Sequence, residues 1–237
     1  MTFRGRLLAT IRAARAVLEC PGVLVVGSEV PNLLEPGAAA TLIVSQDLDI
    51  GVPVDCHAAV KQRLPELLLH FLPSEDEPSV WTPRARDLLE VNFVGIDYRQ
   101  DPTDAYMLED DQLPLLVFGA LSLVEPGAEI DIEGTRIRVP RTAGLLLEKL
   151  VTDRTGVKGE RDLLVALGLI VTGGLADFDE LDVVYRRLRP DLQHTVRSNL
   201  TILSLIEART GMPDPRPQRA AIAALLRRLE SGDRNLP

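Results

Sequence analysis

The sequence predicts an α+β fold, with a mixed sheet in the amino-terminal part and helices in the carboxy-terminal part. Before residue 140, short β-branched and alternating apolar runs are separated by proline and glycine, which is typical of strands. From Thr142 onward the apolar residues recur at helical spacing. We therefore expect a mixed-sheet domain over residues 1–140 and a helical domain over residues 141–237.

Composition is that of a globular protein able to bury a substantial core, with 237 residues, 46% hydrophobic and 26% charged. The formal net charge of −9 argues against broad affinity for nucleic acid, whose phosphates it would repel. No segment reads as a signal peptide or membrane span, so a cytoplasmic location without membrane contact is the default expectation. We interpret Cys20 and Cys56 as small buried hydrophobic residues.

The amino-terminal elements follow from local patterns. Arginines among apolar residues predict an amphipathic opening helix that Pro21-Gly22 stops. Pro31 is compatible with a first helical turn, where its missing N–H costs little. The expected elements are a helix over Arg4–Leu18, a strand over Val23–Val26, a segment Ala38–Val44 leading into an aspartate-bearing strand that ends near Pro53, a helix over His57–Phe71, a loop over Pro73–Pro78, and strands over Asp87–Asp97, Leu115–Val124 and Ile130–Val139, the last with a hairpin turn near Ile132–Thr135.

Helical periodicity governs the rest of the chain. Thr142 and Asp177 are expected amino-terminal caps and Gly211 an expected stop, with Pro213–Pro217 as a link. The expected helices cover Thr142–Thr152, Glu160–Ile170, Phe178–Arg187, Leu192–Arg209 and Gln218–Ser231.

Two short motifs carry chemistry. Gly27-Ser28 ends the first predicted strand, where a glycine lets backbone amides approach a phosphate chain. Asp47 and Asp49 leave a second strand on the same side, because side chains alternate between faces. Two adjacent carboxylates repel unless a cation holds them together, and magnesium prefers such oxygen ligands together with substrate phosphates. The pattern therefore indicates a site for a metal-bound nucleoside triphosphate.

Gly27-Ser28 followed by Asp47-x-Asp49 resembles the nucleotidyltransferase superfamily, whose best-known member is DNA polymerase beta. The resemblance is greater to small bacterial members, including the abortive-infection type toxins, and covers roughly the first two thirds of the chain. Ser45 stands where those proteins often carry a serine or threonine before the paired aspartates. Further matching positions are the hairpin Ile130–Val139, Pro140, Lys149, and a basic-acidic stretch of Lys158, Arg161 and Asp162.

The resemblance implies a metal-dependent nucleotidyltransferase that moves a nucleoside monophosphate from an NTP such as ATP to an acceptor. Asp47 and Asp49 would bind Mg²⁺ or Mn²⁺ and act in catalysis, with a third carboxylate from a neighbouring strand. Glu90 is the first choice for that carboxylate, since it alternates with Leu89 and Val91, and Asp87 is the alternative. The proposed nucleotide-binding residues are Gly27, Ser28 and Lys149.

Other interpretations stay open. Lys149 on a helix is more often a surface lysine, and Lys158, Arg161 and Asp162 more often form a solvated charged face. Glu29 beside the phosphate turn and the prolines after it are compatible with a catalytically silent protein that binds a nucleotide or a partner. A third hypothesis is an interaction module with an exposed apolar face over Leu200–Ile206, which could also serve a homodimer. The acceptor is expected to be a small molecule or protein, not a long nucleic acid.

Overall fold

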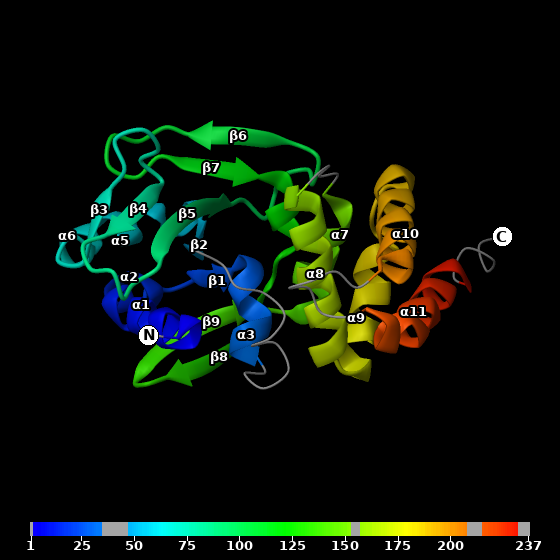
Figure 1. Ribbon diagram of the computed structural model, residues 1–237. Coiled ribbons are helices and arrows are strands. Elements are labelled where there is room, and N and C mark those ends of the chain that lie inside the picture. The colour runs from blue at the N-terminus through cyan, green and yellow to red at the C-terminus, as the bar shows by residue number, and fades with distance from the viewer. Residues whose placement is uncertain (1, 35–46, 153–156, 208–214, 232–237) are drawn as a thin grey trace. The chain divides into compact units, whose positions relative to one another are not determined.

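In the computed structural model, residues 2–34, 47–152, 157–207 and 215–231 are described. The chain divides into two compact units (Figure 1). Among the described residues, the first unit contains residues 2–30 and 47–141, and the second contains residues 31–34 and those from Thr142 onward. The first holds the strands and the second is helical. The predicted mixed sheet with a helical carboxy-terminal part is confirmed.

A mixed seven-stranded sheet organises the first unit. Its central strands β2 (Asp47–Pro53) and β5 (Glu90–Ile96) run parallel to each other. The strands on one path follow the order β1 (Leu24–Val26), β2, β5, β4 (Val80–Pro83) and β3 (Phe71–Pro73), while β7 (Leu115–Phe118) pairs with β5 and with β6 (Ala105–Leu108). Apart from the parallel pairs β2–β5 and β5–β7, the neighbours in this sheet are antiparallel.

One face of the sheet supplies the core of this unit, because apolar residues occupy every second position. Leu48, Ile50 and Val52 of β2 are fully buried, and Val91 and Phe93 of β5 are buried in the same way. Trp81 of β4 meets Phe93 edge to face, with ring centroids 6.1 Å apart. The opposite face of β2 is therefore the one that carries its aspartates.

The opening helix fixes the start of β5. It is interrupted at Ala14, giving α1 (Phe3–Ala13) and α2 (Arg15–Leu18) in place of one helix. Thr10 is fully buried, and its hydroxyl accepts a hydrogen bond from the Leu89 amide at 2.7 Å. Arg6 donates to the Leu88 carbonyl at 2.7 Å. These side chains satisfy backbone groups just before the first residue of β5.

A separate two-stranded hairpin completes the first unit and packs against β1 (Figure 1). Its strands are β8 (Pro126–Ile132) and β9 (Thr135–Pro140). Glu133 and Gly134 form the predicted turn, both with positive φ, as a tight two-residue hairpin requires. The short helical elements of this unit are η1 (Gly27–Glu29), η2 (Val54–Cys56), α5 (His57–Lys61), α6 (Leu64–Leu67) and η3 (Gly119–Leu123). Helix α3 (Val30–Leu34) begins at the end of the first unit, and its residues 31–34 belong to the second.

Several predicted boundaries in the first unit were wrong. The helix expected over His57–Phe71 is two short helices, because Pro65 lies in the first turn of a new helix, α6. Phe71 and Pro73 belong to β3, and β4 and β6 were not predicted. The strand expected to reach Val124 ends at Phe118, where η3 begins. Ala38–Val44 lies outside the described residues.

The second unit is a helical assembly around α7 (Thr142–Val151). Every residue of α7 from Ala143 to Val151 is buried, and α8, α9 and α10 contact it. The other helices are α8 (Val157–Thr172), α9 (Leu175–Tyr185), α10 (Pro190–Leu205), η4 (Arg216–Gln218) and α11 (Arg219–Ser231). In the described part of the chain, none of the helices combines the length and apolarity needed to cross a membrane.

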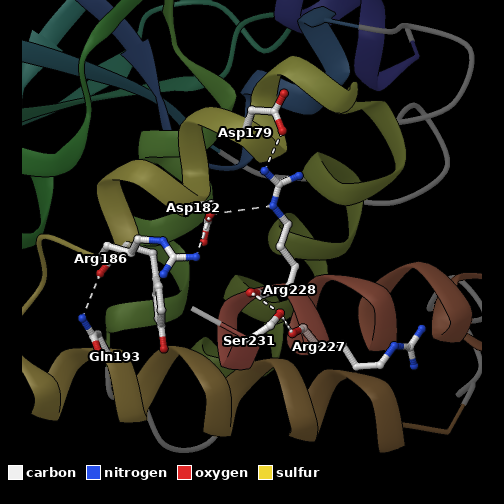
Figure 2. Close-up of polar contacts among 8 residues, drawn as sticks. Asp179, Asp182, Arg186, Gln193, Arg227, Arg228 and Ser231 are labelled. Carbon is white, nitrogen blue, oxygen red and sulfur yellow. Dashed lines mark hydrogen bonds and ion pairs between the residues drawn. The ribbon is translucent and has the colours of Figure 1, made fainter. Parts of the chain in front are cut away.

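Polar contacts join α9 and α11 (Figure 2). Arg228 pairs with Asp179 at 2.5 Å and lies 4.0 Å from Asp182, which also pairs with Arg186 at 3.0 Å.

Helix α9 starts earlier than expected: its cap is Gly174, whose amide donates to Asp177 at 2.8 Å. Asp177 is thus inside the helix and is not the cap. Gly211 and Pro213 lie outside the described residues.

Candidate functional site

The paired aspartates lie where β2 begins, on the face opposite the apolar core. Asp47 is the first residue of β2 and Asp49 the third, and both are partly exposed. Leu48, between them, is fully buried. The alternation predicted from the sequence is therefore present, with two carboxylates on one side of the strand.

The parallel strand β5 brings two further polar residues to the same face. Its register places Glu90 beside Asp47 and Asn92 beside Asp49, on strands about 5 Å apart. The Asn92 amide donates a hydrogen bond to Asp49 Oδ1 at 3.0 Å. Sequence analysis did not single out Asn92, although the same alternation that favours Glu90 puts Asn92 on this face.

Gly27 closes the other side of Asp49. Strand β1 pairs Val26 with Asp49, and Gly27 follows with a φ of +82°. A Cβ added to Gly27 would overlap the Asp49 carboxylate and lie 3.0 Å from its Cγ. Only glycine therefore suits this position, through both its backbone conformation and its lack of a side chain. Asp49 is held between Gly27 and Asn92.

After Gly27, the polar side chains contact each other and do not point freely into a phosphate-binding turn. Ser28 donates to Glu29 Oε1 at 3.4 Å, and Glu29 is 1% exposed. The Glu29 carboxylate thus does not stand in solvent beside the turn. Pro31 lies in the first turn of α3, as expected from its missing N–H.

Of the two candidates for a third carboxylate, Glu90 has the better position. Asp87 precedes β5, is exposed, and has no partner position on β2. Glu90 is exposed and is aligned with Asp47. Of the two candidates, Glu90 therefore shares the face of the aspartates, whereas Asp87 lies outside the strand.

The oxygen donors on this face are of the kind that a hard divalent cation prefers. Asp47, Asp49 and Glu90 supply carboxylates and Asn92 an amide carbonyl, and Mg²⁺ is commonly held by one or two carboxylates together with substrate phosphates. Within the described ranges, no three His, Cys, Asp or Glu side chains come together as a group that could hold a metal ion. These side chains therefore do not complete a metal site by themselves, and substrate phosphates and water would have to supply further ligands.

Lys149 lies in the helical unit, with its charge engaged by neighbouring carboxylates. It is 8% exposed, and its Nζ lies 2.9 Å from Glu148 Oε2 and 3.6 Å from Asp162 Oδ1. Asp162 was expected on a solvated face and is instead 8% exposed, because it pairs with this lysine. Ser45 and the side chains of Lys158 and Arg161 lie outside what the structure describes.

The apolar run in α10 does not form one exposed face. Leu200 and Leu203 are buried, whereas Ile202 and Leu205 are exposed, as helical spacing on an amphipathic helix dictates. Cys20 is buried, as expected of a small apolar residue, whereas Cys56 is only partly buried. Burial raises the pKa of both thiols.

Comparison with known proteins identifies a shared fold. No family model matches the sequence, and no curated protein matches it either. An antigenic nucleotidyltransferase-like protein from Paracoccidioides brasiliensis is 14% identical over 92% of this chain and 93% of its own, with a TM-score of 0.53. A provisionally assigned nucleotidyltransferase from H. pylori is 15% identical over 100% of both chains, with a TM-score of only 0.41. On the first of these likenesses, the chain has the mixed-sheet fold of a nucleotidyltransferase-like protein with a helical carboxy-terminal part.

Proposed function

We propose that this protein is a metal-dependent nucleotidyltransferase. It would transfer a nucleoside monophosphate from an NTP to an acceptor and release pyrophosphate. The observation that carries the proposal is the position of the Asp47 and Asp49 carboxylates on one face of β2, with Gly27 closed against Asp49. The abortive-infection subtype stays a prediction.

The proposal gives each polar residue on this face of the sheet a role. Asp47 and Asp49 hold Mg²⁺ or Mn²⁺, which when bound offsets the charge of the triphosphate and of the leaving pyrophosphate. Gly27 makes room for the Asp49 carboxylate, and the Ser28 hydroxyl, which donates to Glu29 in the structure, would instead donate to a phosphate. Glu90 adds the third carboxylate beside Asp47. Positioning and electrostatics then supply most of the rate, as in other phosphoryl-type transfers.

Lys149 has a less direct part in the proposal. Its buried ammonium is already close to the Glu148 and Asp162 carboxylates. A triphosphate would have to compete with them for this charge. We therefore place the phosphate contacts at Gly27 and Ser28, and a nucleotide-binding role for Lys149, which belongs to the second unit, stays a prediction.

The acceptor is proposed from charge, and a cytoplasmic location is proposed as well. The formal net charge of −9 disfavours a long nucleic acid, so a hydroxyl of a small molecule or protein is the proposed acceptor. A cytoplasmic protein would meet NTPs and magnesium directly.

One observation favours a second candidate function, nucleotide binding without transfer. The β5 residue aligned with Asp49 is the neutral Asn92, not a carboxylate. A site with fewer carboxylates can hold a metal-bound nucleotide, but it stabilises less charge during transfer.

Label transfer separates these two functions. The full-length protein is incubated with each α-³²P-labelled NTP, Mg²⁺ or Mn²⁺, and a panel of hydroxyl-bearing small molecules and proteins, while pyrophosphate is measured. Metal-dependent pyrophosphate release with label on an acceptor, lost in Asp47→Asn/Asp49→Asn, supports transfer. Tight metal-dependent NTP binding without release supports the silent function, and neither binding nor release contradicts both.

A further inference from the structure

We propose that a cavity near the start of β1 binds a small phosphate-bearing molecule through arginine side chains. The cavity has a volume of about 420 Å³, and all the residues that line it belong to the first unit. Its walls are the segment that leads from α2 into β1, the cap position before α6, and the hairpin of β8 and β9. Helix α2 contacts both α6 and β9, so these walls are held together. Three arginines line the cavity, Arg63, Arg136 and Arg138.

Strand β9 presents two of these arginines side by side. Arg136 and Arg138 are two residues apart, and Ile137 between them is 1% exposed. Because side chains alternate along a strand, both arginines leave β9 on the face opposite the buried Ile137 side chain. A guanidinium group carries several N–H donors in a fixed plane and matches the oxygens of a phosphate. The third arginine, Arg63, supplies donors from another wall.

Arg136 carries a charge that the hairpin does not neutralise. Its neighbour across the hairpin is Asp131, which is the natural partner for an ion pair. Asp131 Oδ1 instead accepts a hydrogen bond at 2.9 Å from the Gly134 amide in the turn. Arg136 is exposed, and it takes part in none of the ion pairs found among the described residues. Its guanidinium is therefore available to an anion.

The two carboxylates that line the cavity are both engaged by arginines. Glu19 pairs at 2.9 Å with Arg15, which lies outside the cavity lining. Glu129 pairs with Arg138, its neighbour across the hairpin. Neither glutamate therefore cancels the charge of Arg136.

Arg63 is held only by a weak contact. It pairs with Glu66 at 2.8 Å, but the two side chains are 52% and 53% exposed. Exposed ion pairs of this kind contribute little, because water and salt screen them. A ligand with more negative charge than one carboxylate can therefore compete for Arg63.

The balance of charge identifies the ligand as an anion. Three arginines and two glutamates give the lining a formal charge of +1, in a chain whose formal net charge is −9. A phosphate group suits the cavity better than a carboxylate, because its three terminal oxygens can accept hydrogen bonds from more than one wall. The volume is in the range of small-molecule sites, and the acidic remainder of the chain repels a long nucleic acid.

The cavity is separate from the proposed nucleotide site. Val23 lines the cavity just before β1, whereas Gly27 follows the last residue of β1. At the rise of an extended strand, the three residues of β1 separate the two places by roughly 10 Å. The inference therefore goes beyond the proposed function and does not depend on it.

The experiment is calorimetric titration of the full-length protein with inorganic phosphate and with ribose 5-phosphate. EDTA is present, so that no divalent ion can join a phosphate to the Asp47–Asp49 face. Ribose is the matched probe without a phosphate. We expect both phosphates to bind the wild type and ribose not to bind. Arg63→Gln/Arg136→Gln should weaken binding by about tenfold or more, because charge-assisted hydrogen bonds are lost.

Two control variants locate the binding. Arg4→Gln/Arg86→Gln removes the same charge from exposed residues of the first unit that do not line the cavity, and it should bind as the wild type does. Asp47→Asn/Asp49→Asn should also keep its binding of both phosphates. Urea unfolding followed by Trp81 fluorescence establishes that each variant is folded. If the double arginine variant does not fold, Arg136→Gln alone serves in its place and should weaken binding severalfold.

Four results would overturn the inference. The first is that neither phosphate binds the wild type, and the second is unchanged binding by the folded arginine variant. The third is binding that is lost in Asp47→Asn/Asp49→Asn, which would place the phosphate on the proposed nucleotide site. The fourth is tighter binding of a single-stranded RNA oligonucleotide than of ribose 5-phosphate, which would indicate a nucleic-acid surface. None of these results requires that the proposed transfer activity fail.

Discussion

Gly27→Ala should disturb the site more than any other change of one methyl group. Gly27 has a φ of +82°, and its absent Cβ would overlap the Asp49 carboxylate. The alanine must either leave the left-handed region or push Asp49 away from Asn92. Both routes damage the arrangement that we propose binds the metal-bound nucleotide.

The magnitude follows from a matched control within the same unit. Gly134 also has a φ of +82°, but an added Cβ there meets nothing within 4 Å. Gly134→Ala should therefore show the conformational cost alone, about 1–2 kcal/mol of unfolding free energy. Gly27→Ala adds a steric cost of about 1–3 kcal/mol, because the new carbon lies well inside normal contact distance of Asp49. We expect a total loss of about 2–5 kcal/mol.

The assay is urea unfolding followed by tryptophan fluorescence. Trp81 is the single tryptophan of the chain and lies in the same unit as both glycines, so its signal reports on the unit that is changed. Nucleotide binding is measured on the same samples under native conditions. Equal destabilisation by the two alanines, with Gly27→Ala binding NTP as the wild type does, would refute the reasoning.

Three further changes test other contacts. Thr10→Val removes the acceptor of the buried Leu89 amide at nearly constant shape and should cost about 1–3 kcal/mol in the same fluorescence assay, and an unchanged midpoint would contradict this. Lys61 at 2.6 Å holds the pKa of Asp110 well below its usual range, so the pair stabilises the fold above the unfolded pKa of about 4 and less as the pH falls below it. The stability gap between wild type and Lys61→Met should thus be full at pH 7 and shrink below about pH 4, and a gap independent of pH would argue against the pairing. Lys149→Met leaves the buried Glu148 and Asp162 carboxylates without the ammonium that lies beside them. The free energy of unfolding of the helical unit, followed by circular dichroism, should fall by about 3–5 kcal/mol. A neutral or stabilising effect would contradict a stabilising role for this charge.

Alternation along single strands could be predicted from the sequence. The period of two put Asp47 and Asp49 on one face, and it put Glu90 opposite Val91 and Phe93, as the structure has them. A positive φ was likewise foreseeable at the glycine of the hairpin turn. These features depend on neighbours within a few residues, which the sequence contains directly.

Pairing between distant segments could not be predicted in the same way. The alignment of Asn92 with Asp49 depends on the register of two strands more than 40 residues apart in the chain. The periodicity of a single segment carries no information on that register. Short strands such as β4 and β6 have too few residues for a clear period. The burial of Lys149 depends on Asp162 from the next helix, whereas a helical pattern alone favours a surface lysine.

Calorimetric titration with each NTP, with and without Mg²⁺, tests the central claim most directly. The wild type is compared with Asp47→Asn/Asp49→Asn and with Glu75→Gln/Asp76→Asn, which removes the same charge from exposed residues. We predict Mg²⁺-dependent binding that the first variant loses and the second retains. Binding that survives in Asp47→Asn/Asp49→Asn, or no binding of any NTP by the wild type, would contradict the placement of a metal–nucleotide site on this face of the sheet.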